Sequence, residues 1–413
     1  MEQKNLPLSL IATVCAILLI AIAIFFGQNY ANNLEQKYIH AIAPLYPDSV
    51  INGSALQKVA LQQTDLLPVY GASEEHKEAG PFQASQFFQN YPTGFTPFDA
   101  CKGGADSLTE LEALASVGKS LQGKKVIISF TPKGFFDKPM SQKMYKGFFT
   151  GLHANELIFS PYLSYSTKQL SARRMLHYPE TLGDDPLLSF AIDQLARNTW
   201  LSKMLYWIAY PLGRMQADIM ESQDSYQSVS YIFHNQKMLD NNQPHVVPAT
   251  IDWQANLVQG LSQAQQQDSN NPFGFSKSGW KLVKRRRTKP YMFKPRPYGS
   301  ADAKFIKDLK TSPESADFSL ELQILKELGA KPLLVGRPIN DKYYNAIGIS
   351  NAALNEYYAE IESIAAKYNM PIVDFKNFQN DIYFGVDPAP HTSQEGWVYV
   401  DQVYNNFYHE NIH

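Results

Sequence analysis

The chain has 413 residues, a formal net charge of −2 at pH 7 and 44% hydrophobic residues. This length and apolar content allow one large domain or two, each with a real core. The near-neutral charge gives no global field that would select nucleic acid, so no nucleic-acid partner is expected. A disulfide between the two cysteines, Cys15 and Cys101, is not expected because Cys15 lies in an apolar segment.

The first predicted element is an apolar segment from Leu8 to Phe26 that contains no charged residue. About 19 residues, each rising 1.5 Å along a helix, just span the hydrocarbon core of a bilayer. Lys4 precedes the segment, which favours a cytoplasmic N-terminus. We therefore predict residues 1–27 to be a retained single-pass transmembrane anchor and residues 28–59 to be a juxtamembrane helix and stalk. A cleaved signal peptide is the alternative, but no small-x-small site follows closely.

An apolar run at Leu66–Tyr70 predicts a strand that ends in Gly71-Ala72-Ser73. The carboxyl ends of strands in an open α/β sheet border the crevice where ligands bind, so Ser73 is a candidate nucleophile. A serine at this place is more often a turn former or a helix cap. Further on, Gly103-Gly104 forms a glycine pair whose backbone N–H groups are able to approach an oxyanion, although on this pattern alone an ordinary turn is the better explanation.

The middle of the chain combines a strand with a long helical region. The short apolar run at Lys124–Phe130 predicts a buried strand. Aromatic residues at helical spacing between Met140 and Gln216 predict a helical insertion over roughly residues 140–250. Such an insertion forms a lid, a membrane-facing surface or, more commonly, ordinary aromatic packing.

A basic run covers residues 277–296, which hold nine lysines and arginines and no acid. The run is centred on Lys284, Arg285, Arg286 and Arg287. A run of this kind is usually a solvated face. Outside a membrane it is also suited to an anionic polymer or to anionic headgroups.

The last third alternates helices with strands. We expect helices at 318–328, 352–368 and 394–407 and strands at 332–335 and 370–374. This alternation predicts a parallel sheet with helices on both faces. Asp387 and His391 share one loop before the last helix, and a serine followed late in the chain by an acid and a histidine is typical of α/β serine hydrolases. Such a serine needs a base to accept its proton and an acid to hold the ring of the base.

These motifs together resemble the DltD family, whose members are membrane-anchored proteins of D-alanyl transfer to teichoic acids. The resemblance rests on five stretches in the same order, at 69–74 (VYGASE), 99–108, 270–276 (NNPFGFS), 332–348 and 387–401. It implies an α/β fold with an SGNH-hydrolase-like (flavodoxin-like) parallel sheet flanked by helices. Residues 60–413 would form the extracytoplasmic catalytic domain.

The resemblance also implies the roles of the three candidate catalytic residues. By position, Ser73 would be the nucleophile, His391 the base and Asp387 the acid that orients the imidazole. The acid usually stands three residues before the histidine in this family, whereas Asp387 stands four before it with two prolines between. Either this loop is reshaped or Asp381 takes the role.

Three further residues would complete an oxyanion site. The resemblance places the backbone N–H groups of Ser73 and Gly104 against the developing oxyanion. Gly104 shares its loop with Gly103. A glutamine that usually follows the central strand is missing here, and Thr131 is a possible replacement. No metal or other cofactor is expected, because the remaining histidines show no ligand spacing.

The implied function is transfer of a D-alanyl group to teichoic acid or a similar anionic envelope polymer on the outer face of the membrane. By analogy, the acyl group would come through a membrane-bound O-acyltransferase and D-alanyl carrier pathway proteins. One alternative is an envelope polysaccharide esterase or O-acetyltransferase that uses the same three residues. A second is a non-catalytic scaffold that binds a carrier protein or polymer, which would be favoured if His391 lies beyond hydrogen-bond reach of Ser73, roughly 2.6–3.2 Å.

Overall fold

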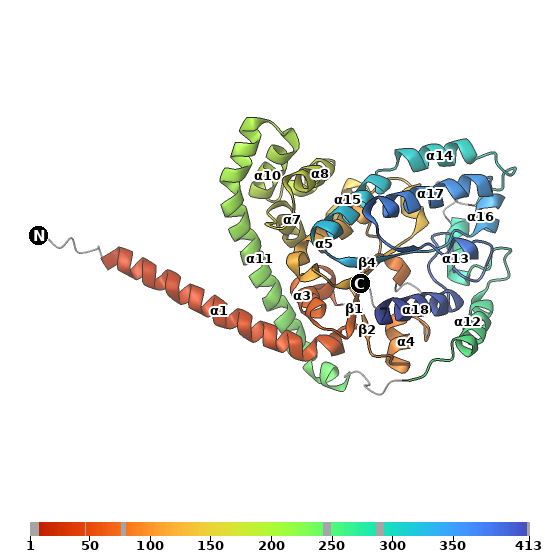
Figure 1. The fold of residues 1–413 in the computed structure, drawn as a ribbon, viewed down its shortest axis with the longest axis horizontal. Helices are drawn as coiled ribbons and strands as arrows, with labels where there is room; N and C mark the ends of the chain where they lie inside the picture. Colours follow the sequence, from red (N-terminus) through yellow and green to blue (C-terminus); the bar gives the residue numbers. More distant parts are fainter. Residues whose placement is uncertain (1–7, 46, 76–79, 243–248, 286–292, 411–413) are drawn as a thin grey trace, which may run out of the picture.

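The computed structural model describes residues 8–45, 47–75, 80–242, 249–285 and 293–410 (Figure 1). Its centre is a five-stranded parallel sheet in the order β2-β1-β3-β4-β5. The strands are β1 (Leu66–Tyr70), β2 (Thr96–Asp99), β3 (Lys125–Phe130), β4 (Lys331–Gly336) and β5 (Ile372–Val373). The predicted α/β fold with a parallel sheet is confirmed.

Helices cover both faces of the sheet because successive strand residues point to opposite sides. In β3, Ile127 enters one core while Val126 and Ile128 enter the other. The helices on the Ile127 side are α4 (Ala84–Asn90), α12 (Trp253–Gln267) and α18 (Gln394–His409) (Figure 1). Those on the other side are α3 (Ala55–Gln62), α5 (Ser107–Val117), α15 (Glu314–Glu327) and α17 (Asn351–Tyr368).

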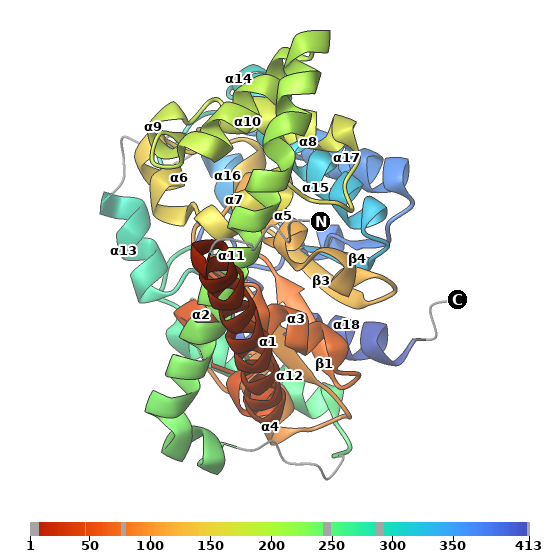
Figure 2. The ribbon, with the colours of Figure 1, turned by 90° about the vertical axis from the view of Figure 1, so that its left-hand side faces the viewer.

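The predicted helical insertion is observed as a group of helices beside the sheet. Its members are α6 (Gln142–Phe148), α7 (Gly151–Ile158), α8 (Tyr165–Met175), α9 (Pro179–Leu182), α10 (Pro186–Arg197) and the long α11 (Trp200–Asn241). The remaining helices are α1 (Leu8–Ile42), α2 (Asp48–Ile51), α13 (Lys277–Arg285), α14 (Asp302–Thr311) and α16 (Asp341–Ala346). Figure 2 shows α1 and α11 on the same side of the molecule.

One continuous helix, α1, crosses the boundary that we predicted between an anchor and a stalk at residue 27. Its second half packs on α11, where Gln28 Nε2 donates to Ser222 Oγ at 3.0 Å and Tyr38 donates to Asp240 Oδ1 at 3.0 Å. Within the described residues, no helix combines the length and the apolarity that a membrane crossing needs. The single-pass crossing therefore stays a prediction.

The edge strand β2 was not predicted from the sequence. Pro97 lies in this strand and pairs with Leu67 of β1. Proline donates no hydrogen bond, and in sheets it is tolerated mainly on edge strands. Strands β1 and β2 are parallel, so both end at the same end of the sheet. The glycine-pair loop, which follows β2, therefore starts beside the end of β1.

Candidate active site

Strand β1 brings Ser73 to the carboxyl end of the parallel sheet. The chain order reverses between β1 and β3, and ligands of open α/β sheets bind at such a switch point. Ser73 begins a short 3-10 turn, Ser73–Glu75, directly after the strand. A Cβ atom on Gly71 would lie 2.8 Å from the backbone oxygen of Ser129 on β3. Only glycine therefore allows this turn to sit so close to the neighbouring strand.

The structure brings Ser73, His391 and Asp387 into one chain of contacts, although the first two are 318 residues apart. Ser73 Oγ lies 2.8 Å from His391 Nε2. His391 Nδ1 lies 2.8 Å from both carboxylate oxygens of Asp387, and Asp387 is buried. A carboxylate on Nδ1 favours the tautomer that keeps the proton there, which leaves Nε2 free to accept the serine proton.

The acid loop explains how an acid four residues before the histidine reaches its ring. The backbone N–H of Val386 donates to the carbonyl of His391 at 2.8 Å and closes the loop between them. Within this loop the N–H of Ala389 donates to Asp387 Oδ1 at 2.9 Å, which turns the carboxylate inward. Asp381 instead accepts the N–H of Tyr383 at 3.0 Å, and burial raises its pKa. Asp387 rather than Asp381 therefore contacts the histidine.

The segment from residue 270 to α13 supports the acid loop from behind. The N–H of Ser276 donates to the carbonyl of Val386 at 3.0 Å. A Cβ atom on Gly279 of α13 would lie 2.2 Å from that carbonyl and 2.8 Å from Asp387 Cβ. This close approach holds the backbone of Asp387 against α13. Helix α13 therefore lies directly beside the three candidate catalytic residues.

A buried clamp, formed by Arg337, Glu75 and Thr392, links the two halves of the triad. Arg337 follows β4 and has no solvent exposure. Its Nη2 donates at 2.5 Å to Oε1 of Glu75, a residue that lies two positions after the candidate nucleophile. Its Nε donates to Thr392 Oγ1 at 2.8 Å, one residue after the candidate base. One guanidinium thus holds the serine turn and the histidine loop at a fixed separation.

The clamp is enclosed by aromatic side chains, which raises the cost of leaving any of its charges unpaired. The hydroxyl of Tyr404 donates to Glu75 Oε1 at 3.0 Å, and the guanidinium lies over the ring of Trp397 at 5.6 Å. The adjacent Glu74 is also buried; burial raises its pKa, and the neighbouring Glu75 raises it further. The clamp was not predicted from the sequence, although Arg337 directly follows a predicted strand, as the turn of Ser73 does.

The predicted oxyanion residues lie at the same edge of the sheet. The N–H of Lys102 donates to the carbonyl of Gly71 at 3.0 Å, which sets the loop of Gly103 and Gly104 beside the serine turn. Thr131 follows β3, the neighbour of β1. Within the part of the chain that the structure describes, no recorded hydrogen bond joins these three residues to Ser73. Their oxyanion role stays a prediction.

The basic run begins next to the triad, because α13 packs against the acid loop. Lys284 is exposed on this helix, and its Nζ lies 5.1 Å from the centre of the Trp280 ring. Arg286 and Arg287 lie outside the described residues, and the side chain of Arg285 is not described. The helix that packs on Asp387, α13, therefore also carries the described positive charges of the run.

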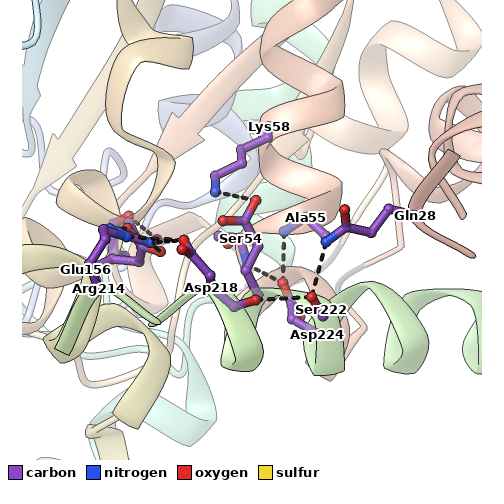
Figure 3. A network of polar contacts seen from close by, with 12 residues as sticks. Gln28, Ser54, Ala55, Lys58, Glu156, Arg214, Asp218, Ser222 and Asp224 are labelled. Carbon is purple, nitrogen blue, oxygen red and sulfur yellow. Dashed lines mark hydrogen bonds and ion pairs between the residues drawn. The ribbon is translucent and has the colours of Figure 1, made fainter. Parts of the chain in front are cut away.

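One group of carboxylates approaches the spacing of a metal site among the described residues: Glu156, Asp218 and Glu221. Positive side chains already neutralise all three, and Figure 3 shows Arg214 beside Glu156 and Asp218. Arg214 pairs with Glu156 at 2.5 Å and with Asp218 at 2.8 Å, while Lys58 pairs with Glu221 at 2.7 Å. This arrangement is that of an ion-pair network, and the expected lack of a metal stays a prediction.

Comparisons with known proteins agree over nearly the whole chain. A family model described as "DltD protein" matches residues 44–409. The chain is 25% identical over 396 residues to "Protein DltD" of Bacillus subtilis (strain 168), which covers 96% of each protein. It is 23% identical over 361 residues to "Protein DltD" of Staphylococcus aureus (strain NCTC 8325 / PS 47), which covers 86% of this chain and 84% of that protein.

Proposed function

The chain belongs to the DltD family, and from this premise we propose that it transfers a D-alanyl group to teichoic acid or a similar anionic envelope polymer. The observation that carries the proposal is the contact of 2.8 Å between Ser73 Oγ and His391 Nε2, continued to Asp387 at 2.8 Å. This distance lies within the reach that proton transfer requires, which favours an enzyme over a scaffold. The family membership favours D-alanine over an acetyl group.

The reaction would pass through an ester on Ser73. Ser73 Oγ attacks the carbonyl carbon of the D-alanyl donor while its proton moves to His391 Nε2. The tetrahedral intermediate expels the donor group, which leaves with that proton, and D-alanine stays esterified to the serine. A hydroxyl of the polymer then attacks the ester; His391 takes the proton of the hydroxyl and returns it to Ser73. Asp387 holds the ring and stabilises the imidazolium in both steps.

The envelope location rests on the family and on the first helix. Residues 8–26 carry no charge, and every described side chain among them is exposed. We propose that this part of α1 anchors the protein in the membrane with the N-terminus in the cytoplasm and the sheet outside. A membrane-bound O-acyltransferase and a D-alanyl carrier would then supply the acyl donor. The basic run next to Asp387 supports an anionic acceptor, since polyanions bind by charge.

The test is the amount of ester-linked D-alanine on envelope polymers of cells that lack this protein. The cells are complemented with the wild type, with Ser73→Ala or with His391→Ala, and protein levels are matched. Wild type is expected to restore the ester, and both variants are expected to fail. Ser166→Ala and His177→Ala, at exposed positions on α8 and just after it, serve as matched controls and are expected to restore it.

Other outcomes of the same experiment overturn the proposal. If both triad variants restore the ester, the triad is idle and the protein acts as a scaffold. If D-alanine is unchanged by loss of the protein, the acyl group is wrong. Acetyl esters on envelope polysaccharides are then the product to assay.

A further inference from the structure

Helices α1 and α11 run parallel where they pack together and diverge toward their N-terminal ends (Figure 1). They pack in parallel: Gln28 contacts Ser222, and further along both helices the carbonyl of Ala41 accepts from Asn242 Nδ2 at 2.9 Å. The N-terminal parts of α1 and α11, which precede Gln28 and Ser222 in the sequence, diverge on the same side of the molecule (Figures 1 and 2). Two helical arms therefore project from one point.

The arm of α11 carries an apolar row that ends at this junction. We call this row the α11 stripe; its side chains are 41–65% exposed and belong to Leu201, Met204, Ile208, Leu212, Met215 and Ile219. Successive members are three or four residues apart, and Ser222 follows three residues after the last. Such spacing places all of them on one face of the helix. The stripe thus runs along one face of α11 toward Ser222, the residue that Gln28 of α1 contacts.

A second face of the same arm is buried in the protein. Its members, Ser202, Tyr206, Ala209, Gly213 and Ala217, are also three or four residues apart. Tyr206 donates to the carbonyl of Ile158 in α7 at 2.8 Å. The arm of α11 is therefore held against the domain by one face, while the stripe on the other face stays uncovered.

The arm of α1 is apolar on all sides, unlike the arm of α11. Residues 8–26 contain no charge, and exposed side chains such as Val14, Leu18, Ile22 and Phe25 follow the helical row that leads to Gln28. A helix that is apolar all round requires an apolar surrounding. A helix with one apolar face is suited to the boundary between an apolar and an aqueous phase.

The composition of the α11 arm identifies that boundary as a lipid surface. Residues 198–217 contain no acid, and their only charges are Lys203 and Arg214. The two acids that follow before Ser222, Asp218 and Glu221, pair with Arg214 and Lys58. Trp200 and Trp207 are both exposed beside the stripe. Tryptophan is enriched where hydrocarbon meets headgroups, and a helix poor in acids avoids repulsion by anionic lipids.

We propose that the α11 stripe lies in the interfacial layer of the lipid bilayer that surrounds the arm of α1. The proposal rests on the proposed function only for the envelope location. It fixes the catalytic domain relative to the bilayer, because Asp224 of α11 accepts the backbone N–H groups of Ser54 and Ala55 at 2.7 and 2.8 Å (Figure 3). These residues start α3, which leads into β1 and Ser73. Ser73 is thereby held at a set distance from the membrane.

The test places a lipid-sensitive probe on the stripe of the full chain. Ile208→Cys and Val258→Cys are made in a Cys15→Ser background, labelled with an environment-sensitive fluorophore and reconstituted into vesicles of phosphatidylcholine and phosphatidylglycerol. The two positions are matched, with exposures of 65% and 62%, and Val258 lies on α12. Lipids that carry a spin label near the headgroup are expected to quench the Ile208 probe several-fold more than the Val258 probe. Aqueous iodide is expected to show the reverse preference.

Two results overturn the proposal. Equal quenching of the two probes by spin-labelled lipid shows that the stripe faces water. Shielding of the Ile208 probe in native membranes, without lipid quenching in pure vesicles, shows that a protein partner covers the stripe. Neither result depends on acyl transfer, so a failure here is distinguishable from a failure of the proposed function. Retained D-alanyl ester in cells that express Ile208→Cys confirms that the labelled protein has an intact triad.

Discussion

The triad edge of the sheet and the α1–α11 side of the molecule are held by opposite means. At the triad edge, charged side chains are buried and paired: Arg337 bridges Glu75 and Thr392, and Asp387 holds His391. On the α1–α11 side, polar contacts gather at one junction and the arms beyond it expose apolar side chains. In the proposed function the first region positions atoms for acyl transfer, and in the proposed membrane placement the second positions the whole domain on the bilayer.

Removal of the acid charge tests the first region most strongly. Asp387→Asn keeps the shape of the side chain but no longer fixes the tautomer of His391, so transfer is expected to fall by about 10³–10⁴-fold. The rate of D-alanyl transfer by the purified protein measures the effect. Asp381→Asn is the matched control and is expected to retain most of the activity. A larger loss from Asp381→Asn would assign the role to the other acid.

Removal of the clamp cation tests whether buried charge holds the triad together. Arg337→Met leaves Glu75 buried without its cation and is expected to lower the free energy of unfolding by about 3–5 kcal/mol. Urea unfolding measures this loss, and Arg173→Met, at an exposed arginine, is the control. The double variant Arg337→Met/Glu75→Gln is expected to recover stability but not transfer, because the serine and histidine loops are no longer linked. Full transfer by the double variant would contradict a positioning role.

A buried acid away from the triad predicts a pH dependence of stability. Burial raises the pKa of Glu112 to about 8, against 4.5 for an ordinary glutamate. Between these values the folded protein keeps a proton that the unfolded chain releases. The free energy of unfolding should therefore fall as pH rises, by up to about 1.4 kcal/mol per pH unit from this group.

Glu112→Gln is expected to remove this part of the slope between about pH 5 and pH 8, because its amide still accepts the hydroxyl of Tyr145. Thermal unfolding across that range measures the slope. The exposed Glu180→Gln is the control. An unchanged slope in Glu112→Gln would show that the carboxyl is ionised in the folded state.

The basic helix α13 is expected to give the smallest effect, because its lysines are exposed and screened by salt. Lys277→Gln, Lys281→Gln and Lys284→Gln together should weaken binding of a teichoic acid polymer a few-fold and flatten its salt dependence. Equilibrium binding at several salt concentrations measures both. The same number of exposed lysines replaced elsewhere, at Lys307, Lys310 and Lys326, is the control. Equal effects of the two sets would show that α13 is merely a solvated face.

Most of the sheet could be predicted from the sequence, because its strands are short apolar runs between helical patterns. Strands β1, β3, β4 and β5 lie where those runs predicted them. The edge strand β2 was missed because Pro97 and the following glycine pair indicate a turn. The predicted boundary at residue 27 lies inside α1 for a different reason: the uncharged polar residues from Gln28 onward end the apolar run, but they do not end the helix.

Only those residues of the candidate site that lie in recognisable sequence motifs were predictable. The order of Ser73, Asp387 and His391 predicted the triad, and the structure brings the three together. Nothing in the sequence marks Arg337 as buried, since arginine is rarely buried and its partners lie 262 and 55 residues away. The α11 stripe is readable as helical spacing. The sequence does not tell which face of this helix is covered, because that depends on where α1 and α7 pack against it.

The most direct test of the account is a search for D-alanine on Ser73 itself. The purified protein is incubated with a D-alanyl thioester donor in the absence of polymer, and the peptide that contains Ser73 is analysed by mass spectrometry. We predict a D-alanyl ester on Ser73 that disappears when polymer is added, is absent in Ser73→Ala and forms far more slowly in His391→Ala. Transfer to polymer by Ser73→Ala at the wild-type rate would contradict the account.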